Sequence, residues 1–114
     1  EEMRIEKIQI DTLDAYCTRA GVEQIDLLKL DVEGNELSVL QGGHELLSRR
    51  AIKRIQFEYS ATYIDARIFL KDMFELLASY GYKLYKIDRD RLQALNTYRY
   101  EMENFHYQNW VALL

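Results

Sequence analysis

The stretch IDLLKLDVEGNE, residues 25–36, decides the fold that we expect for this chain. Residues 25–30 are mostly leucine and isoleucine, and a run this short and this apolar predicts a strand that is buried on both faces. The acidic turn from Asp31 to Gly34 follows, and a helix is expected to begin near Asn35. A buried strand that runs through a glycine turn into a helix is typical of an α/β fold.

The residues before this stretch predict a strand and a short helix. Residues 4–10 alternate loosely between polar and apolar side chains, as a strand does. Asp11 or Thr12 offers a side-chain oxygen to cap a helix in which apolar residues share one face from residue 13 to residue 20. Gly21 is expected to end this helix, because glycine tolerates the left-handed backbone of a helix C-terminus.

Downstream of residue 36, helical and strand patterns alternate along the chain. The helix that begins near Asn35 is expected to break or kink at Gly42-Gly43. Residues 55–59 alternate between apolar and polar side chains and predict a strand with one buried face. Apolar residues from 69 to 80 recur every three or four positions, which predicts a helix closed by Gly81.

Two more predicted strands, residues 82–88 and 107–114, end the chain with no helix between them, so we expect this pair to be antiparallel. The polar connection 89–106 is either functional or hides a short helix. The whole order predicts an α/β domain with a mostly parallel sheet, helices on both faces and an antiparallel last strand pair.

The composition restricts the classes of protein to which the chain can belong. Its 114 residues are 48% hydrophobic and 30% charged, which fits one folded domain. Fifteen basic residues against nineteen acidic ones leave no basic stripe for nucleic acid. No apolar run approaches the ~18 residues of a membrane helix, and the single cysteine, Cys17, rules out an internal disulfide. We therefore expect a soluble protein of the cytoplasm with no nucleic-acid or membrane partner.

Acidic side chains fall at the ends of two predicted strands, where open α/β sheets bind their ligands. Asp31 and Glu33 follow the first buried strand, Glu58 lies near the end of the next, and Glu36 comes three residues after Glu33. If these strands are neighbours, the carboxylates converge on one edge of the sheet. The alternative is structural, because Glu33 and Glu36 can cap a helix start and Glu58 can simply face solvent. Asp31 fits this alternative less well, since an unpaired carboxylate at the end of a buried strand is costly.

Other chemically active residues carry weaker signals. His44 and His106 lack the spacing of metal ligands, and Cys17 lies on the apolar side of a helix, as core cysteines do. The chain contains neither a Gly-x-Ser-x-Gly nucleophile turn nor a phosphate-binding glycine loop.

Several segments resemble the FkbM-type methyltransferases. The resemblance is carried by TLD at residues 12–14, by KLDVEGNE at 29–36 followed by VLQG at 39–42, by IQFEY at 55–59 and by the region 80–87. These motifs extend over essentially the whole chain.

This resemblance implies an S-adenosylmethionine-dependent methyltransferase of the Rossmann-like class that methylates hydroxyl groups of sugars or small natural products. The strand ending at Asp31 would be the fourth of a seven-stranded sheet, beside both the transferable methyl group and the acceptor. From the resemblance we expect Asp31 and Glu33 to be catalytic and Asp31 also to contact the cofactor. We expect Glu58 and Glu36 to bind the small-molecule or glycan acceptor.

The chain departs from the family pattern at its start. The glycine-rich turn after the family's first strand and the acidic residue that holds the cofactor ribose have no counterpart here. We therefore expect residues 1–114 to be the C-terminal half of a methyltransferase domain, which binds S-adenosylmethionine poorly and is inactive alone. One edge of the strand that contains Leu28 would then be unpaired, and dimerisation is one way to cover it.

Two alternatives stay open. In the first, the chain is a non-catalytic remnant or interaction module that keeps half of the fold. A weaker alternative is a divalent cation held by Asp31, Glu33 and Glu58, since hard cations prefer carboxylate oxygens.

Overall fold

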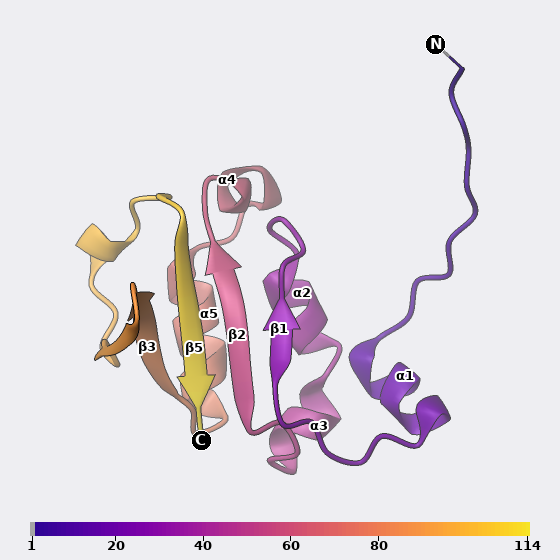
Figure 1. Ribbon diagram of the computed structural model, residues 1–114, viewed down its shortest axis with the longest axis horizontal. Coiled ribbons are helices and arrows are strands. Elements are labelled where there is room, and N and C mark those ends of the chain that lie inside the picture. Colours follow the sequence, from indigo (N-terminus) through magenta and orange to yellow (C-terminus); the bar gives the residue numbers. More distant parts are fainter. Residues whose placement is uncertain (1) are drawn as a thin grey trace.

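The computed structural model describes residues 2–114, which form a five-stranded mixed sheet with helices against it (Figure 1). The strands are β1 (Leu28–Leu30), β2 (Arg54–Tyr59), β3 (Lys83–Asp88), β4 (Arg91–Ala94) and β5 (Gln108–Leu113). The helices are α1 (Leu13–Ala20), α2 (Glu36–Gln41), α3 (His44–Ser48), α4 (Thr62–Ala66), α5 (Leu70–Ser79) and the 3-10 helix η1 (Tyr100–Met102).

The strand order across the sheet is β1-β2-β5-β3-β4. Only β1 and β2 pair in parallel, whereas β2–β5, β5–β3 and β3–β4 are antiparallel. The expected antiparallel pairing of the last two predicted strands is confirmed, but the expected mostly parallel sheet is wrong. The reason is the place of β5, which returns between β2 and β3 and separates two strands that run in the same direction.

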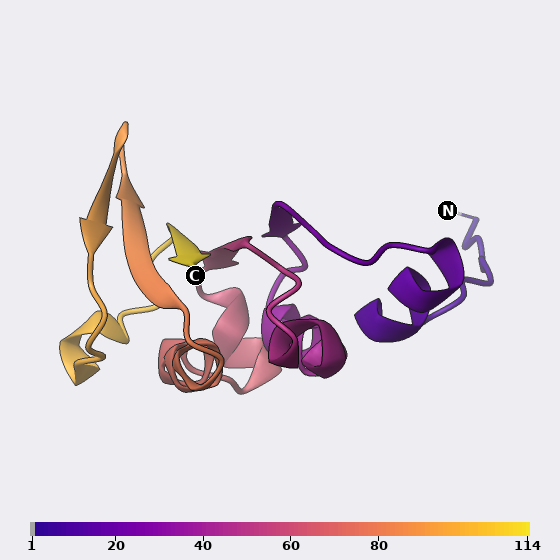
Figure 2. The same ribbon diagram turned by 90° about the horizontal axis from the view of Figure 1, so that it is seen from below.

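The helices cover one face of the sheet, not both as expected. Figure 2 shows α2, α3, α4 and α5 on the same side of the strands, and no helix that the structure describes lies over the other side. Right-handed crossovers that step across a sheet in the same direction pass over the same face. Both crossovers here, from β1 to β2 and from β2 to β3, step in the same direction. The opposite face is called the uncovered face below.

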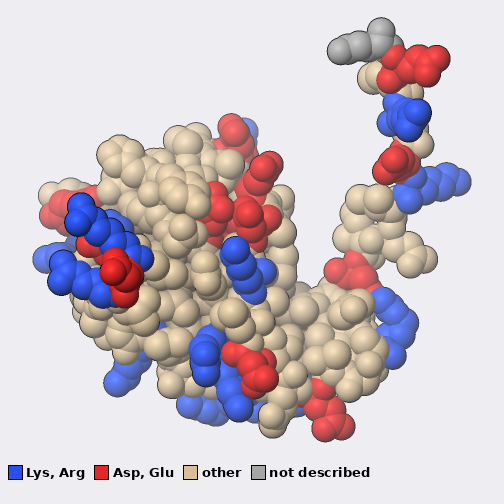
Figure 3. Space-filling model, in the orientation of Figure 1, with Lys and Arg blue, Asp and Glu red and all other residues tan. Residues whose placement is uncertain are grey.

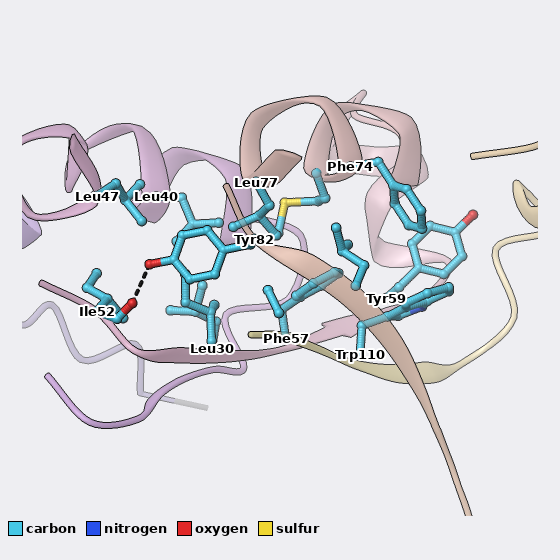
Figure 4. Close-up of a cluster of buried hydrophobic side chains, with 14 of the residues drawn as sticks. Leu30, Leu40, Leu47, Ile52, Phe57, Tyr59, Phe74, Leu77, Tyr82 and Trp110 are labelled. Carbon is cyan, nitrogen blue, oxygen red and sulfur yellow. Dashed lines mark hydrogen bonds between the residues drawn. The ribbon is translucent and has the colours of Figure 1, made fainter. Parts of the chain in front are cut away.

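The hydrophobic core lies between the sheet and these helices (Figure 4). The alternation along β2 puts Ile55, Phe57 and Tyr59, each 0% exposed, on the helical side. Trp110 of β5 lies opposite Phe57 in register. Its ring meets that of Phe74 from α5 edge to face at 5.2 Å, so aromatic packing joins the middle of the sheet to α5.

The prediction of a strand at residues 4–10 is wrong. Residues 2–10 form no secondary structure and extend away from the sheet in Figure 1. Ile5 and Ile10 are 94% and 89% exposed. A strand is stabilised by a neighbouring strand, and no segment that the structure describes pairs with these residues.

The first helix follows its expected signals. The Thr12 side chain accepts the Ala15 amide at 3.1 Å, and Gly21 ends α1 with a left-handed φ of 72°. Asp14 then anchors α1 to α3, because its carboxylate accepts the Glu45 and Leu46 amides at 2.9 and 3.1 Å.

The expected break at Gly42-Gly43 is confirmed, and it separates α2 from α3. A β-carbon at position 42 would lie 3.2 Å from the Thr12 Cβ, and one at position 43 would lie 3.0 Å from the Leu13 Cδ2. The two glycines therefore allow the start of α1 to pack closely against the break.

The connection 89–106 contains a short helix, η1, which confirms one of the two interpretations of this segment. It also contains β4, which sequence patterns did not reveal. All four residues of β4 are exposed and the strand pairs only with β3, so its sequence has no buried face to show.

At the other end of the sheet, β1 is the edge strand, and dimerisation through this edge stays a prediction. None of the helices in the described part of the chain has the length and apolar character needed to cross a membrane.

Candidate functional site

Two acidic residues, Asp31 and Glu58, are brought together at the carboxyl ends of β1 and β2. These strands are parallel neighbours with Leu30 opposite Phe57, so the next pair in register is Asp31 and Glu58. Both side chains follow the alternation onto the uncovered face. Figure 3 shows acidic side chains gathered at this end of the face. The predicted convergence of the Asp31 and Glu58 carboxylates is therefore present in the fold.

The proximity of these two carboxyl groups changes the acidity of one of them. Burial raises the pKa of Glu58 above its ordinary value, and a side-chain hydrogen bond with Asp31 and the charge of Asp31 raise it further. The charges of Glu36 and Glu33 act in the same direction. The acidic neighbours thus favour the protonated form of the Glu58 carboxyl group.

Glu36 has a different position from the other three acidic residues. Its side chain is 1% exposed, and its two carboxylate oxygens accept the Val32 amide at 3.2 Å and the Gly34 amide at 2.9 Å. These contacts are those of a residue that shapes the turn before α2, whereas the structural alternative had Glu36 capping the start of the helix. Acceptor binding by Glu36 stays a prediction, and the geometry directs its carboxylate toward the backbone of the turn.

The turn itself is held in an unusual backbone conformation. Glu33 has a φ of 50° and Gly34 a φ of 98°. A β-carbon at Gly34 would lie 2.7 Å from the Thr62 carbonyl oxygen and 3.0 Å from the Ala66 Cβ. The turn therefore packs directly against α4, and Glu33 is exposed at its tip. The predicted role of Glu33 stays a prediction.

The helix α4, which was not predicted, supports the end of β2. Tyr63 is fully buried, and its hydroxyl donates to the Glu58 carbonyl oxygen at 2.9 Å. Burial raises the pKa of Tyr63, so this hydroxyl stays a donor. The sequence signal that was missed is Ser60, whose hydroxyl accepts the Thr62 amide at 3.3 Å at the start of the helix.

Two residues of the β5 region continue the same edge. Asn109 lies directly opposite Glu58 in the β2–β5 register. Its side-chain amide donates to the Tyr107 hydroxyl at 3.2 Å, and Tyr107 is 66% exposed.

The metal alternative does not fit the geometry. In residues 2–114 no group of three or more histidine, cysteine, aspartate or glutamate side chains is arranged to hold a metal ion. The expected cation site formed by Asp31, Glu33 and Glu58 is therefore wrong. His44 lies 3.3 Å from the Asp14 carboxylate, and Cys17 is buried as expected.

The positions of the glycines show whether the described chain contains a glycine turn of the kind that holds a nucleotide cofactor. Gly34 is the glycine that follows a strand, whereas the other four follow helices. The space beside Gly34 is filled by Thr62, so its backbone has no room for a ligand of the kind that glycine-rich turns hold. The turn at Gly34 therefore offers no glycine-rich cradle of this kind.

Comparisons with known proteins relate this geometry to a family. Residues 1–84 match the family model described as the methyltransferase FkbM domain. The 2-O-methyltransferase NoeI of Sinorhizobium fredii is 33% identical over 75 residues, a stretch that covers 64% of this chain and 30% of that relative. The match thus spans about three tenths of the curated relative. No solved structure matches the chain.

Proposed function

Because the chain belongs to the FkbM methyltransferase family, we propose that it supplies the acceptor side of an S-adenosylmethionine-dependent O-methyltransferase. The proposed acceptor is a hydroxyl group of a sugar or another small molecule. The observation that carries the proposal is the adjacency of Asp31 and Glu58 at the carboxyl ends of two parallel strands that pair in register. Open α/β sheets bind their ligands at this position.

The chemistry required of these residues is the removal of a proton from a hydroxyl group. A hydroxyl becomes a strong nucleophile when a base within hydrogen-bond distance accepts its proton. In the proposal Asp31 is this base, and Glu58 holds its proton and orients the Asp31 carboxylate. Glu33, at the exposed tip of the turn, is the second candidate for contact with the acceptor. The cofactor supplies the activated methyl group.

In this function the chain does not act alone. Its residues form no glycine cradle for the cofactor, and its match covers 30% of the curated relative. We propose that S-adenosylmethionine binds mainly to residues outside this chain and that the chain is inactive by itself.

The test is turnover by the natural full-length protein with the substitution Asp31→Asn. Loss of a general base lowers kcat by about 100- to 10,000-fold. Asp26→Asn is a matched control, because Asp26 precedes β1 and has a side chain that is 85% exposed. Unchanged turnover of Asp31→Asn at saturating acceptor would remove Asp31 from the catalytic role.

A second candidate function is a non-catalytic interaction module, and the missing glycine cradle favours it. Calorimetric titration of the 114-residue chain with S-adenosylmethionine tests it. Binding at micromolar strength contradicts the interaction module and also the expectation that the cofactor site lies elsewhere. Absence of turnover by the full-length protein with every acceptor would favour the module.

A further inference from the structure

A row of side chains crosses the uncovered face from the carboxyl pair, and the polarity of these side chains changes along the row. Glu58 of β2 lies opposite Asn109 of β5, and Asn109 lies opposite Ile87 of β3. Ile87 in turn lies opposite Leu92 of β4, which is 49% exposed. Side chains directly opposite in antiparallel strands have Cβ atoms about 5 Å apart. The row therefore passes from carboxyl groups through an amide to apolar side chains.

Tyr107 lies at the same edge, next to the amide of this row. Its hydroxyl accepts a hydrogen bond from the Asn109 side chain at 3.2 Å, and the residue is 66% exposed. Its ring is in none of the aromatic contacts that join Tyr59, Tyr63 and Phe105. An exposed ring next to an amide offers a flat apolar surface and hydrogen-bonding groups on one side of a ligand.

We propose that Tyr107 and Asn109 bind the acceptor beside the Asp31–Glu58 pair, and that this acceptor is an uncharged sugar. The inference rests on the proposed function and adds the residues and the charge of its substrate. The Tyr107 ring stacks on the apolar face of the sugar ring, and the Asn109 amide donates to and accepts from sugar hydroxyls. The hydroxyl nearest the carboxyl pair is then the one that loses its proton.

The charge of the edge selects against acidic acceptors. Asp31, Glu33 and Glu58 all lie at this end of the uncovered face, and an anionic acceptor such as a sugar phosphate would be repelled by them. The structure therefore assigns an unphosphorylated acceptor to this site.

The experiment measures sugar binding without cofactor, so that it is independent of methyl transfer. The isotope-labelled 114-residue chain is titrated with the methyl glycosides of common neutral hexoses and deoxyhexoses, followed by nuclear magnetic resonance. We expect at least one glycoside to shift the Asn109 side-chain amide and the Tyr107 ring. The corresponding sugar phosphate should bind at least about tenfold more weakly. Shifts confined to other residues, or no shift with any glycoside, would overturn the inference.

Two substitutions at Tyr107 distinguish the contribution of its ring to binding from that of its hydroxyl. Tyr107→Ala should weaken glycoside binding about tenfold or more, whereas Tyr107→Phe keeps the stacking surface and should weaken it about threefold or less. Tyr100→Ala is the matched control, because Tyr100 is 80% exposed but lies on η1. Equal binding by Tyr107→Ala and Tyr100→Ala contradicts the role of the ring. The amide spectrum of each variant shows whether it is folded.

Kinetics of the natural full-length protein distinguish failure of this inference from failure of the proposed function. Asn109→Ala should raise the KM for the acceptor more than it lowers kcat, and it should leave the KM for S-adenosylmethionine unchanged. Glycoside binding without any turnover would leave this inference standing and overturn the proposed function. Turnover that Tyr107→Ala and Asn109→Ala do not affect would overturn this inference alone.

Discussion

The Tyr59 hydroxyl donates a 2.7 Å hydrogen bond to the Glu103 carboxylate, which joins the end of β2 to the connection that leads into β5. The same carboxylate accepts the Tyr98 hydroxyl at 2.8 Å and the backbone amides of Leu70 and Lys71 at 2.8 and 3.2 Å. Burial and then the bond to Glu103 raise the pKa of Tyr98 to about 12. One carboxylate thus binds a strand end, the first turn of α5 and the segment before Tyr107.

Replacement of this carboxylate should loosen all three elements. We expect Glu103→Gln to lower the free energy of unfolding by about 1–3 kcal/mol, because an amide accepts fewer hydrogen bonds and leaves buried donors without a partner. Urea unfolding followed by the fluorescence of the single tryptophan, Trp110, measures this loss. Glu101→Gln, two residues earlier on an exposed side chain, is the control and should change stability by less than about 0.5 kcal/mol. Equal losses in both variants would contradict the prediction.

The Glu36 carboxylate is expected to stabilise the acidic turn. In Glu36→Gln only the carbonyl oxygen accepts a hydrogen bond, so the Val32 or the Gly34 amide faces a donor instead. We expect a loss of about 1–3 kcal/mol in the free energy of unfolding. The same change at Glu33, which is exposed three residues earlier, should cost much less in the same urea experiment. A variant at Glu36 that is as stable as the one at Glu33 would show that the turn does not depend on these bonds.

Gly34→Ala tests the close contact between the turn and α4. The new β-carbon would lie 2.7 Å from the Thr62 carbonyl oxygen at a φ of 98°, so both a clash and backbone strain oppose it. Gly21→Ala is the control, because Gly21 has a φ of 72° but nothing within 4 Å of the added carbon. We expect about 1 kcal/mol of destabilisation at Gly21 and at least about 2 kcal/mol at Gly34. Thermal unfolding of both variants measures the difference, and similar melting temperatures would rule out the clash.

Glu58→Gln should change how stability depends on pH. The pKa of Glu58 is raised in the folded chain, first by burial and then by Asp31, so the folded state binds its proton more tightly than the unfolded state does. The free energy of unfolding of the wild type therefore falls as the pH rises from the ordinary carboxyl range through the raised pKa. Glutamine carries no such charge and keeps a donor for Asp31.

The variant should accordingly be more stable than the wild type at neutral pH, by up to about 1 kcal/mol at this partly exposed site. The difference should disappear below about pH 4, where the carboxyl group is protonated in both states. Urea unfolding at a series of pH values measures it. A difference that stays constant from acidic to neutral pH would contradict the raised pKa of Glu58.

Sequence patterns identified segments whose own side chains meet the core. The apolar spacing of α5 and the alternation of β2 express contacts that each segment makes along its whole length, so Phe57 and Phe74 were recognisable before any fold was known. The patterns failed for residues 4–10 and for β4, because pairing with another strand, and not burial, decides whether such segments are strands.

The candidate site shows the same division. The motif around Asp31 and Glu33 and the alternation that ends at Glu58 indicated one acidic edge, and the parallel pairing of β1 with β2 confirmed it. The inward position of Glu36 and the place of Asn109 opposite Glu58 depend on contacts across the chain. No local pattern encodes these contacts.

The amino-acid sequence by itself determined the order of most elements, the break at Gly42-Gly43, the acidic edge and, through its motif, the family. Local conformational preference and the burial period of each segment are sufficient for the order of elements and the break, whereas the acidic edge and the family were read from the motif. Only the tertiary structure decided that β5 enters between β2 and β3, that the helices share one face, and that Asn109 lies opposite Glu58. Those features arise from register and crossover direction, which are properties of pairs of segments.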